Sequence, residues 1–151
     1  MSRGGTLDPA TVLAAAKAMP SIEGFPTVDE LAAWFETLEA QDPDRVASSR
    51  IGSSRLGEPL RCVTIGDGSV DVVVVAGVHP NEPIGFRTIQ QLATTLLEGG
   101  AVASLDVRWH LVPCIDPDGT RLNEGWFDGA GDRRVYARNF YRPAPNEQVE
   151  W

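Results

Sequence analysis

Hydrophobic residues near the start of the chain recur at the spacing of an α-helix. A first helix is predicted over residues 9–18, where the carboxylate of Asp8 can cap the N-terminus. A second helix is predicted after the tripeptide GFP, because Thr27 and Glu30 have the spacing of a capping box. Its apolar positions are Leu31, Trp34, Phe35 and Leu38. We therefore expect residues 1–44 to form an N-terminal helical segment, followed by the main domain over residues 45–151.

The pattern changes from helical to extended after this segment. Residues 45–54 and 59–66 alternate polar and apolar positions on either side of a connection that contains Gly57, which predicts a β-hairpin. Residues 70–78 contain four consecutive valines and therefore show no alternation. Both faces of this strand are expected to be covered, as in a central strand of an α/β sheet.

A helical pattern follows and runs to Gly99, and a further strand is predicted over residues 105–115. The order strand, helix, strand implies a parallel pair, so the expected fold is α/β, with a mixed, mostly parallel sheet flanked by helices. From Asp116 onward the chain is rich in Gly, Pro, Asn, Asp and Arg and shows no periodic element. A long irregular segment inside a compact domain is usually functional.

Composition narrows the classes of partner. The 151 residues are 42% hydrophobic and 23% charged, which is typical of a globular domain. The formal net charge of −8 disfavours a nucleic acid, since a phosphate backbone attracts clustered Lys and Arg. No apolar run approaches the roughly 20 residues of a membrane-spanning helix, so no membrane association is expected. The first residues lack the apolar core of a secretory signal, which favours a cytoplasmic location. Cys62 and Cys114 are expected to be buried thiols.

His79 and Glu82 occur in the sequence HPNE, directly after the valine-rich strand. Ligands of an open α/β sheet bind beyond the carboxyl ends of the strands, so both side chains are expected at a functional edge. An imidazole nitrogen and a carboxylate oxygen at this spacing can bind one Zn²⁺ ion. The alternative is a structural pair at a helix N-terminus, where a carboxylate complements the helix dipole.

Two further motifs follow HPNE along the chain, DPDG at residues 116–119 and ARNF at residues 137–140. In this order, the three motifs resemble the M14 family of zinc metallocarboxypeptidases, which includes succinylglutamate desuccinylase and aspartoacylase relatives. The resemblance covers residues 45–151 and implies a zinc-carboxypeptidase-like fold with zinc as its cofactor.

The resemblance also implies roles for individual residues. His79 and Glu82 match the first two zinc ligands of the family. Arg138 and Asn139 match the residues that bind the substrate, and an Arg suits a terminal carboxylate because its planar fork can make two parallel hydrogen bonds. Arg121 matches a catalytic arginine near the oxyanion.

Several positions depart from the family pattern. Ala137 and Asp116 stand where the family has Asn. The third zinc ligand of the family, a His, and its general-base Glu come later in the family's sequence. His110 is the other histidine of this sequence besides His79, but it lies in an apolar strand before DPDG and is expected to be a packed or surface residue. The sequence is therefore expected to be an N-terminal portion, incomplete at its C-terminal side, that needs a C-terminal half or a partner chain.

The expected function is hydrolysis of a C-terminal peptide bond by a zinc metallocarboxypeptidase, with this portion alone lacking full activity. One alternative is a zinc-dependent N-acyl amino acid deacylase, and another is a non-catalytic module. The carboxypeptidase and the deacylase would both act on a substrate with a free carboxylate, which is a peptide for the first and an N-acyl amino acid for the second.

Overall fold

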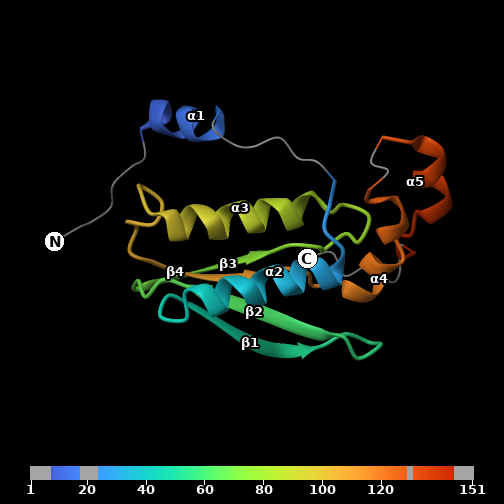
Figure 1. Ribbon diagram of the computed structural model, residues 1–151, viewed down its shortest axis with the longest axis horizontal. Helices are drawn as coiled ribbons and strands as arrows, with labels where there is room; N and C mark the ends of the chain where they lie inside the picture. Colours follow the sequence, from blue (N-terminus) through green and yellow to red (C-terminus); the bar gives the residue numbers. More distant parts are fainter. Residues whose placement is uncertain (1–7, 18–23, 129–130, 145–151) are drawn as a thin grey trace.

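The computed structural model describes residues 8–17, 24–128 and 131–144. Four strands form one sheet in the order β1-β2-β4-β3, and helices pack against it (Figure 1). The elements are α1 (Pro9–Lys17), α2 (Val28–Gln41), β1 (Val46–Ser53), β2 (Pro59–Ile65), β3 (Val70–Val75), α3 (Ile84–Glu98), β4 (Val107–Val112), α4 (Pro117–Arg121), the 3-10 helix η1 (Glu124–Trp126) and α5 (Arg133–Asn139). No described helix has the length and hydrophobicity needed to span a membrane.

The sheet is mixed. β1 pairs with β2 and β2 pairs with β4 in antiparallel orientation, whereas β3 and β4 are parallel. The predicted hairpin, the parallel strand pair and the mixed α/β class are confirmed. Among the described strands, however, the parallel pair is the minority, so the sheet is not mostly parallel in this part of the chain.

The two N-terminal helices begin as the sequence predicts. The carboxylate of Asp8 accepts a hydrogen bond of 3.2 Å from the backbone N–H of Thr11 at the start of α1, and Ala18, the predicted last residue of this helix, lies outside the described residues. At the start of α2, the Thr27 hydroxyl accepts from the Glu30 N–H at 3.2 Å, while the Glu30 carboxylate accepts from the Thr27 N–H at 2.8 Å. The capping box is therefore confirmed.

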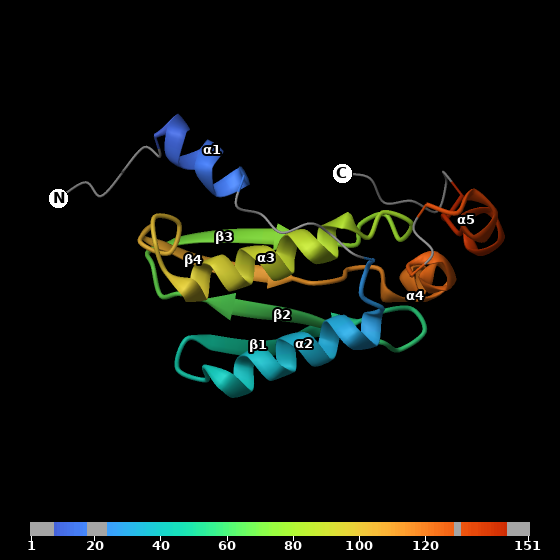
Figure 2. The same cartoon turned by 45° about the horizontal axis from the view of Figure 1, so that its top comes forward.

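The hydrophobic core lies between one face of the sheet and helices α2 and α3. Figure 2 shows these two helices side by side over the same face. Leu31 and Phe35 of α2 are 1% and 2% exposed and belong to one buried cluster with Phe86 and Ile89 of α3. A domain boundary after residue 44 stays a prediction, but α2 contributes directly to the core of the sheet.

The prediction that both faces of the valine-rich strand are covered is wrong for the described part of the chain. β3 is an edge strand, and Val73 and Val75 are 63% and 43% exposed. The side chains of a strand alternate between the two faces, and α2 and α3 cover only one of them. A run of valines shows that both faces of a strand are apolar, but it does not show whether another element covers each face.

The segment after Asp116 is also more regular than predicted. Asp116 caps α4 by accepting a hydrogen bond of 2.9 Å from the Gly119 N–H, and Pro117 occupies the first turn. This helix has only five residues, and α5 has seven, so neither is long enough to show a hydrophobic period. The expected turn at DPDG is the first turn of a short capped helix.

We predict that the exposed edge and face of β3 drive self-association of the chain. No described strand pairs with the outer side of β3, and unpaired strand edges with apolar side chains promote association. Val73→Lys places a charge on this strand and should shift the sedimentation profile toward monomer. Leu56→Lys is the matched control, because Leu56 is 80% exposed at the tip of the β1–β2 hairpin. A monomeric wild-type chain, or an equal effect of both variants, would contradict the prediction.

Candidate metal and substrate site

The first motif forms a tight turn between β3 and α3. Gly77 has a φ of +68°, and a Cβ at this position would lie only 3.0 Å from the Cys114 sulfur, so a larger residue does not fit. The backbone N–H of Glu82 donates to the carbonyl of His79 at 3.0 Å and closes the turn. The turn therefore holds the imidazole and the carboxylate on the same side of the chain.

His79 and Glu82 are in direct contact, with the imidazole Nδ1 3.2 Å from the carboxylate Oε2. The side chains are 30% and 52% exposed. The hydrogen bond from His79, supported by the positive charge of Arg142, lowers the pKa of the Glu82 carboxyl below its ordinary value. The carboxylate is therefore ionised at neutral pH, which is the form that binds a metal.

The geometry of this pair fits two ligands of one zinc ion. Zinc bonds of about 2.0–2.2 Å at a tetrahedral angle place two ligand atoms roughly 3.3–3.5 Å apart. The observed separation of Nδ1 and Oε2 is 3.2 Å, so a zinc ion between them needs only a small shift of the side chains. Within the described residues, no group of three His, Cys, Asp or Glu side chains could hold a metal. This part of the chain thus supplies two donors where a catalytic zinc site uses three.

The second motif packs directly against the first. A Cβ at Gly119 would overlap the carboxylate of Asp116 and would lie 2.9 Å from the ring of Pro80. Only a glycine permits α4 to approach the HPNE turn this closely. The predicted motifs HPNE and DPDG are therefore brought together in space, with DPDG in a structural position.

Asn123 connects α4 to the segment that follows the third motif. Its side chain is fully buried, and its Nδ2 donates to the carbonyls of Gly119 at 2.9 Å and Tyr141 at 2.8 Å. Its Oδ1 accepts from the Tyr141 N–H at 3.0 Å and from the Trp126 indole N–H at 3.3 Å. Every hydrogen-bonding group of this buried amide has a partner, so we refer to Asn123 and the Tyr141 backbone as the Asn123 clamp.

The clamp places Arg142 against the first motif. The guanidinium donates a hydrogen bond of 3.0 Å from NH1 to Oε1 of Glu82, and its side chain is 29% exposed. Sequence reasoning missed Asn123 and Arg142. Both lie just outside DPDG and ARNF, in the segments IDPDGTRLNEGWF and YARNFYRP that carry the resemblance, but no role was assigned to either residue.

The two predicted substrate-binding residues lie at the end of α5. Asn139 donates from Nδ2 to the carbonyl of Val135 at 2.9 Å, and its side chain is packed so closely on Gly125 that no Cβ fits there. Arg138 is exposed, and no hydrogen bond or ion pair fixes it among the described residues. Its guanidinium is accessible to a substrate, whereas Asn139 is engaged with the protein. The substrate-binding roles of both residues stay predictions.

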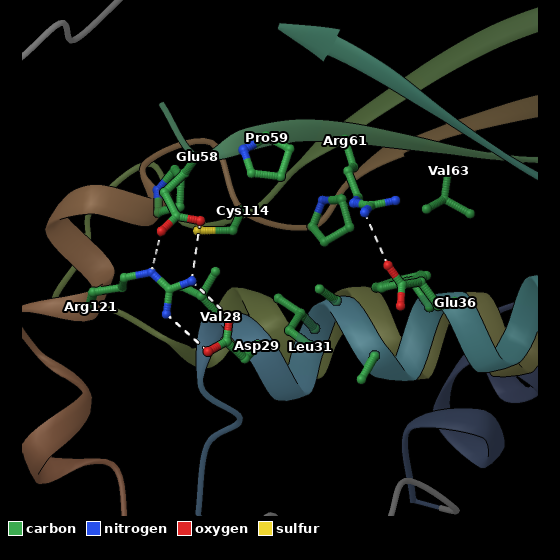
Figure 3. Close-up of a pocket in the computed structure, with 15 residues that line it drawn as sticks. Val28, Asp29, Leu31, Glu36, Glu58, Pro59, Arg61, Val63, Cys114 and Arg121 are labelled. Atoms are coloured by element: carbon green, nitrogen blue, oxygen red, sulfur yellow. Dashed lines mark hydrogen bonds and ion pairs between the residues drawn. The ribbon is translucent and has the colours of Figure 1, made fainter. Parts of the chain in front are cut away.

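Arg121 occupies a different environment from the other predicted site residues. Its guanidinium donates from Nε to Glu58 at 2.7 Å and from NH2 to Asp29 at 2.7 Å (Figure 3). Hydrogen bonds to Asp29 and Glu58 raise the pKa of Arg121 and keep it charged. None of the described contacts brings Arg121 to His79 or Glu82, and its catalytic role stays a prediction.

Arg121 borders a pocket of about 320 Å³ between α2 and the start of β2 (Figure 3). The lining includes Glu58, Arg61 and Cys114 but neither His79 nor Glu82. Cys114 is partly buried and Cys62 is buried, and both are free thiols. Burial raises the pKa of the Cys114 thiol to about 12, so it is a poor nucleophile at neutral pH.

His110 is held by polar contacts across three strands. Its Nε2 lies 2.7 Å from a carboxylate oxygen of Asp71, and its Nδ1 lies 3.2 Å from the hydroxyl of Thr64. Both ring nitrogens therefore have a protein partner. This arrangement agrees with the expectation of a packed or surface histidine.

Comparisons with known proteins bear on the family and on the fold. The sequence profile of the zinc carboxypeptidase family, Peptidase_M14, matches residues 31–140. Carboxypeptidase B of Astacus astacus is 25% identical over 97 residues, which cover 60% of this chain and 32% of that protein. Zinc carboxypeptidase A 1 of Anopheles gambiae is 26% identical over 137 residues, covering 84% of this chain and 31% of that protein. The chain thus spans about a third of the length of these curated relatives.

Solved structures share the fold. Carboxypeptidase A from Helicoverpa armigera aligns with a TM-score of 0.61 at 18% identity, over 82% of this chain and 32% of that chain. Bovine thrombin-activatable fibrinolysis inhibitor, in complex with tick carboxypeptidase inhibitor, aligns with a TM-score of 0.57 at 18% identity, over 76% of this chain and 36% of that chain. The described sheet and helices therefore correspond to part of a carboxypeptidase fold.

We predict that Arg121 stabilises the chain through its two carboxylate partners. Arg121→Gln should lower the melting temperature by roughly 2–4 °C, the scale expected for a small ion-pair network. Arg134→Gln removes the same charge from an exposed position of α5 and should leave the melting temperature unchanged. A melting temperature equal in wild type and Arg121→Gln would show that the network contributes nothing.

The pH dependence of this effect has a defined sign. Arg121 holds the pKa of the Asp29 carboxyl below its ordinary value of 3.8. A lowered folded-state pKa contributes stability above the unfolded pKa, and this contribution is lost as pH falls through the folded value. The difference in melting temperature between wild type and Arg121→Gln should therefore narrow below about pH 4.

Proposed function

Because this chain belongs to the zinc carboxypeptidase family, we propose that it provides the first part of a zinc-dependent site that hydrolyses a C-terminal peptide bond. The proposal rests mainly on the 3.2 Å contact between His79 and Glu82 at the carboxyl end of β3, which fits two ligands of one zinc ion. Support comes from DPDG, which packs on this turn, and from Arg142, which follows ARNF and contacts Glu82.

Each residue has a defined part in this proposal. His79 and Glu82 would hold the metal, which when bound polarises the scissile carbonyl and lowers the pKa of a bound water toward about 7. Arg138 would bind the substrate's carboxylate with its planar fork, because its guanidinium is exposed at the end of α5. A third ligand and a general base are needed as well, and no described side chain provides them next to His79 and Glu82.

Ala137 stands where the family has an Asn next to the substrate-binding Arg, so the class of substrate is best decided by experiment. In the proposed enzyme, a peptide and an N-acyl amino acid both present a free carboxylate, and Arg138 can bind either. Hydrolysis of a short peptide, with no hydrolysis of N-acyl aspartate or N-succinyl glutamate, would support the carboxypeptidase. The opposite preference would support a deacylase. If the protein hydrolyses neither kind of substrate, the result would support a non-catalytic module.

We predict weak zinc binding by this chain, because two donors hold the metal less tightly than three. Zinc added in excess should be lost on dialysis, as measured by elemental analysis of the dialysed protein. His79→Ala should remove the residual binding, and His110→Ala should not, since both ring nitrogens of His110 have protein partners. One tightly held zinc per chain, lost in His79→Ala, would show that a further group completes the site.

We predict that Arg138→Lys weakens substrate binding in the catalytically active protein. Lys keeps the charge but loses the fork, and a hydrogen bond to a charged group contributes on the order of 1.5–3 kcal/mol. The ratio kcat/KM should therefore fall roughly 10- to 150-fold, mostly through a higher KM, because the carboxylate is bound in both ground and transition states.

The control for Arg138 is an amidated substrate. It lacks the carboxylate charge, so it should be hydrolysed slowly by the wild type and lose little further activity in Arg138→Lys. An equal loss on free-acid and amidated substrates, together with a lower melting temperature, would refute the binding role and leave Arg138 as a structural residue.

A further inference from the structure

Glu82 is held on both of its carboxylate oxygens. Oε2 lies 3.2 Å from Nδ1 of His79, and Oε1 accepts a hydrogen bond of 3.0 Å from Arg142. The side chain is 52% exposed, so without these contacts water would leave it free to change rotamer. The two contacts leave one carboxylate oxygen facing the imidazole and the other facing away from it.

Arg142 is itself attached to a rigid part of the structure. The preceding residue, Tyr141, exchanges two backbone hydrogen bonds with the amide of Asn123, at 2.8 and 3.0 Å. Asn123 is fully buried and also donates to the carbonyl of Gly119 in α4. The guanidinium therefore extends from a fixed backbone position toward Glu82.

From these contacts we propose that Arg142 is a positioning residue for Glu82, a proposal that rests on the proposed function of the His79–Glu82 pair. Arg142 holds Oε1 so that Oε2 faces His79, which is the arrangement in which both side chains can bind one divalent cation. The benefit is entropic, because ordering a free Glu side chain costs up to about 2 kcal/mol, and Arg142 orders it before the metal arrives. Partners that orient a metal ligand in this way typically change affinity by about 10- to 100-fold.

Arg142 also carries a positive charge, which opposes the approach of a cation. Two positive charges on zinc and one on Arg142 at roughly 5 Å repel each other by less than about 2 kcal/mol in water, and salt reduces this further. The orienting and repelling effects are thus similar in size, and a single charge-removing variant could not separate them. Lys separates them, because Arg142→Lys keeps the charge, but its shorter side chain does not place a donor where NH1 of Arg142 contacts Oε1 of Glu82.

The test is a zinc titration of the whole chain, in which NMR signals of the His79 ring protons report zinc binding. His110 gives the internal reference signal, since its ring nitrogens are engaged with Asp71 and Thr64. Arg142→Lys should weaken zinc binding about tenfold, so that a concentration that half-saturates the wild type occupies roughly a tenth of the variant. Arg142→Gln should weaken it less, because it also removes the repulsion. Arg134→Gln on α5 is the matched control and should bind zinc like the wild type.

Two results would overturn the proposal. If Arg142→Lys binds zinc as tightly as the wild type, the hydrogen bond from NH1 of Arg142 does not position Glu82. If Arg142→Gln binds zinc more tightly, Arg142 acts as a competing cation. A lower melting temperature without a change in zinc affinity would mean a structural role only.

A metal-free measurement keeps this question separate from the proposed function. Carbon relaxation of the Glu82 side chain should show greater mobility in both Arg142 variants, with the mobility of other surface glutamates unchanged. If the wild type shows no zinc-dependent change at His79, the metal site fails, and the relaxation data still decide whether Arg142 orders Glu82. Equal mobility in wild type and variants would refute the positioning role.

The Asn123 clamp offers a further check on the same proposal. Asn123→Asp keeps the oxygen that accepts from Tyr141 but loses the donor to the Tyr141 carbonyl. If it folds, it should weaken zinc binding, and adding Arg142→Lys should weaken it little further because both act through one contact. Fully additive effects would show that the clamp and Arg142 act independently.

Discussion

The parallel pairing of β3 and β4 brings the HPNE turn and the DPDG helix together. The ladder continues past the strands, since the Ala76 N–H donates to the carbonyl of Val112 at 2.9 Å and the Ile115 N–H donates to the carbonyl of Ala76 at 3.0 Å. Both strands therefore end at the same edge of the sheet. The HPNE turn follows one strand and Asp116 follows the other, so two motifs that are far apart in sequence meet without a long connection. Antiparallel strands would have placed them at opposite edges.

Local features of the fold and the parallel pairing of β3 and β4 could be predicted from the sequence, whereas the exposure of β3 and the short helices after β4 could not. The capping box of Thr27 and Glu30 involves neighbours along the chain, and its geometry follows from their spacing alone. The exposure of Val73 depends on what lies beside β3 in space, which the valines themselves do not encode. The short helix α4 escaped prediction because five residues are held by one cap and by packing on Pro80 rather than by a periodic apolar face.

The candidate site shows the same division. His79 and Glu82 could be paired from their spacing, and their side chains are in contact. Arginines are harder to assign, because a long flexible side chain reaches whichever carboxylate the fold brings near. The position of Arg121 after DPDG predicts a catalytic role, yet its partners Asp29 and Glu58 come from α2 and from the β1–β2 hairpin. Arg142 lies two residues after ARNF, was assigned no role, and still contacts Glu82, a partner 60 positions away in the sequence.

The sequence separations of these contacts also bear on the order in which the chain folds. Asn123 and Tyr141 are 18 positions apart, whereas Glu82 and Arg142 are 60 apart. Closing the longer loop directly costs about 1 kcal/mol more in chain entropy than closing the shorter one. Once the shorter loop has closed on α4, however, Arg142 is already attached to the sheet and its contact with Glu82 adds little further loop entropy. By loop entropy alone, forming the Asn123 clamp before the contact between Arg142 and Glu82 is therefore the less costly order, so we expect the Glu82 carboxylate to become ordered after the clamp has closed.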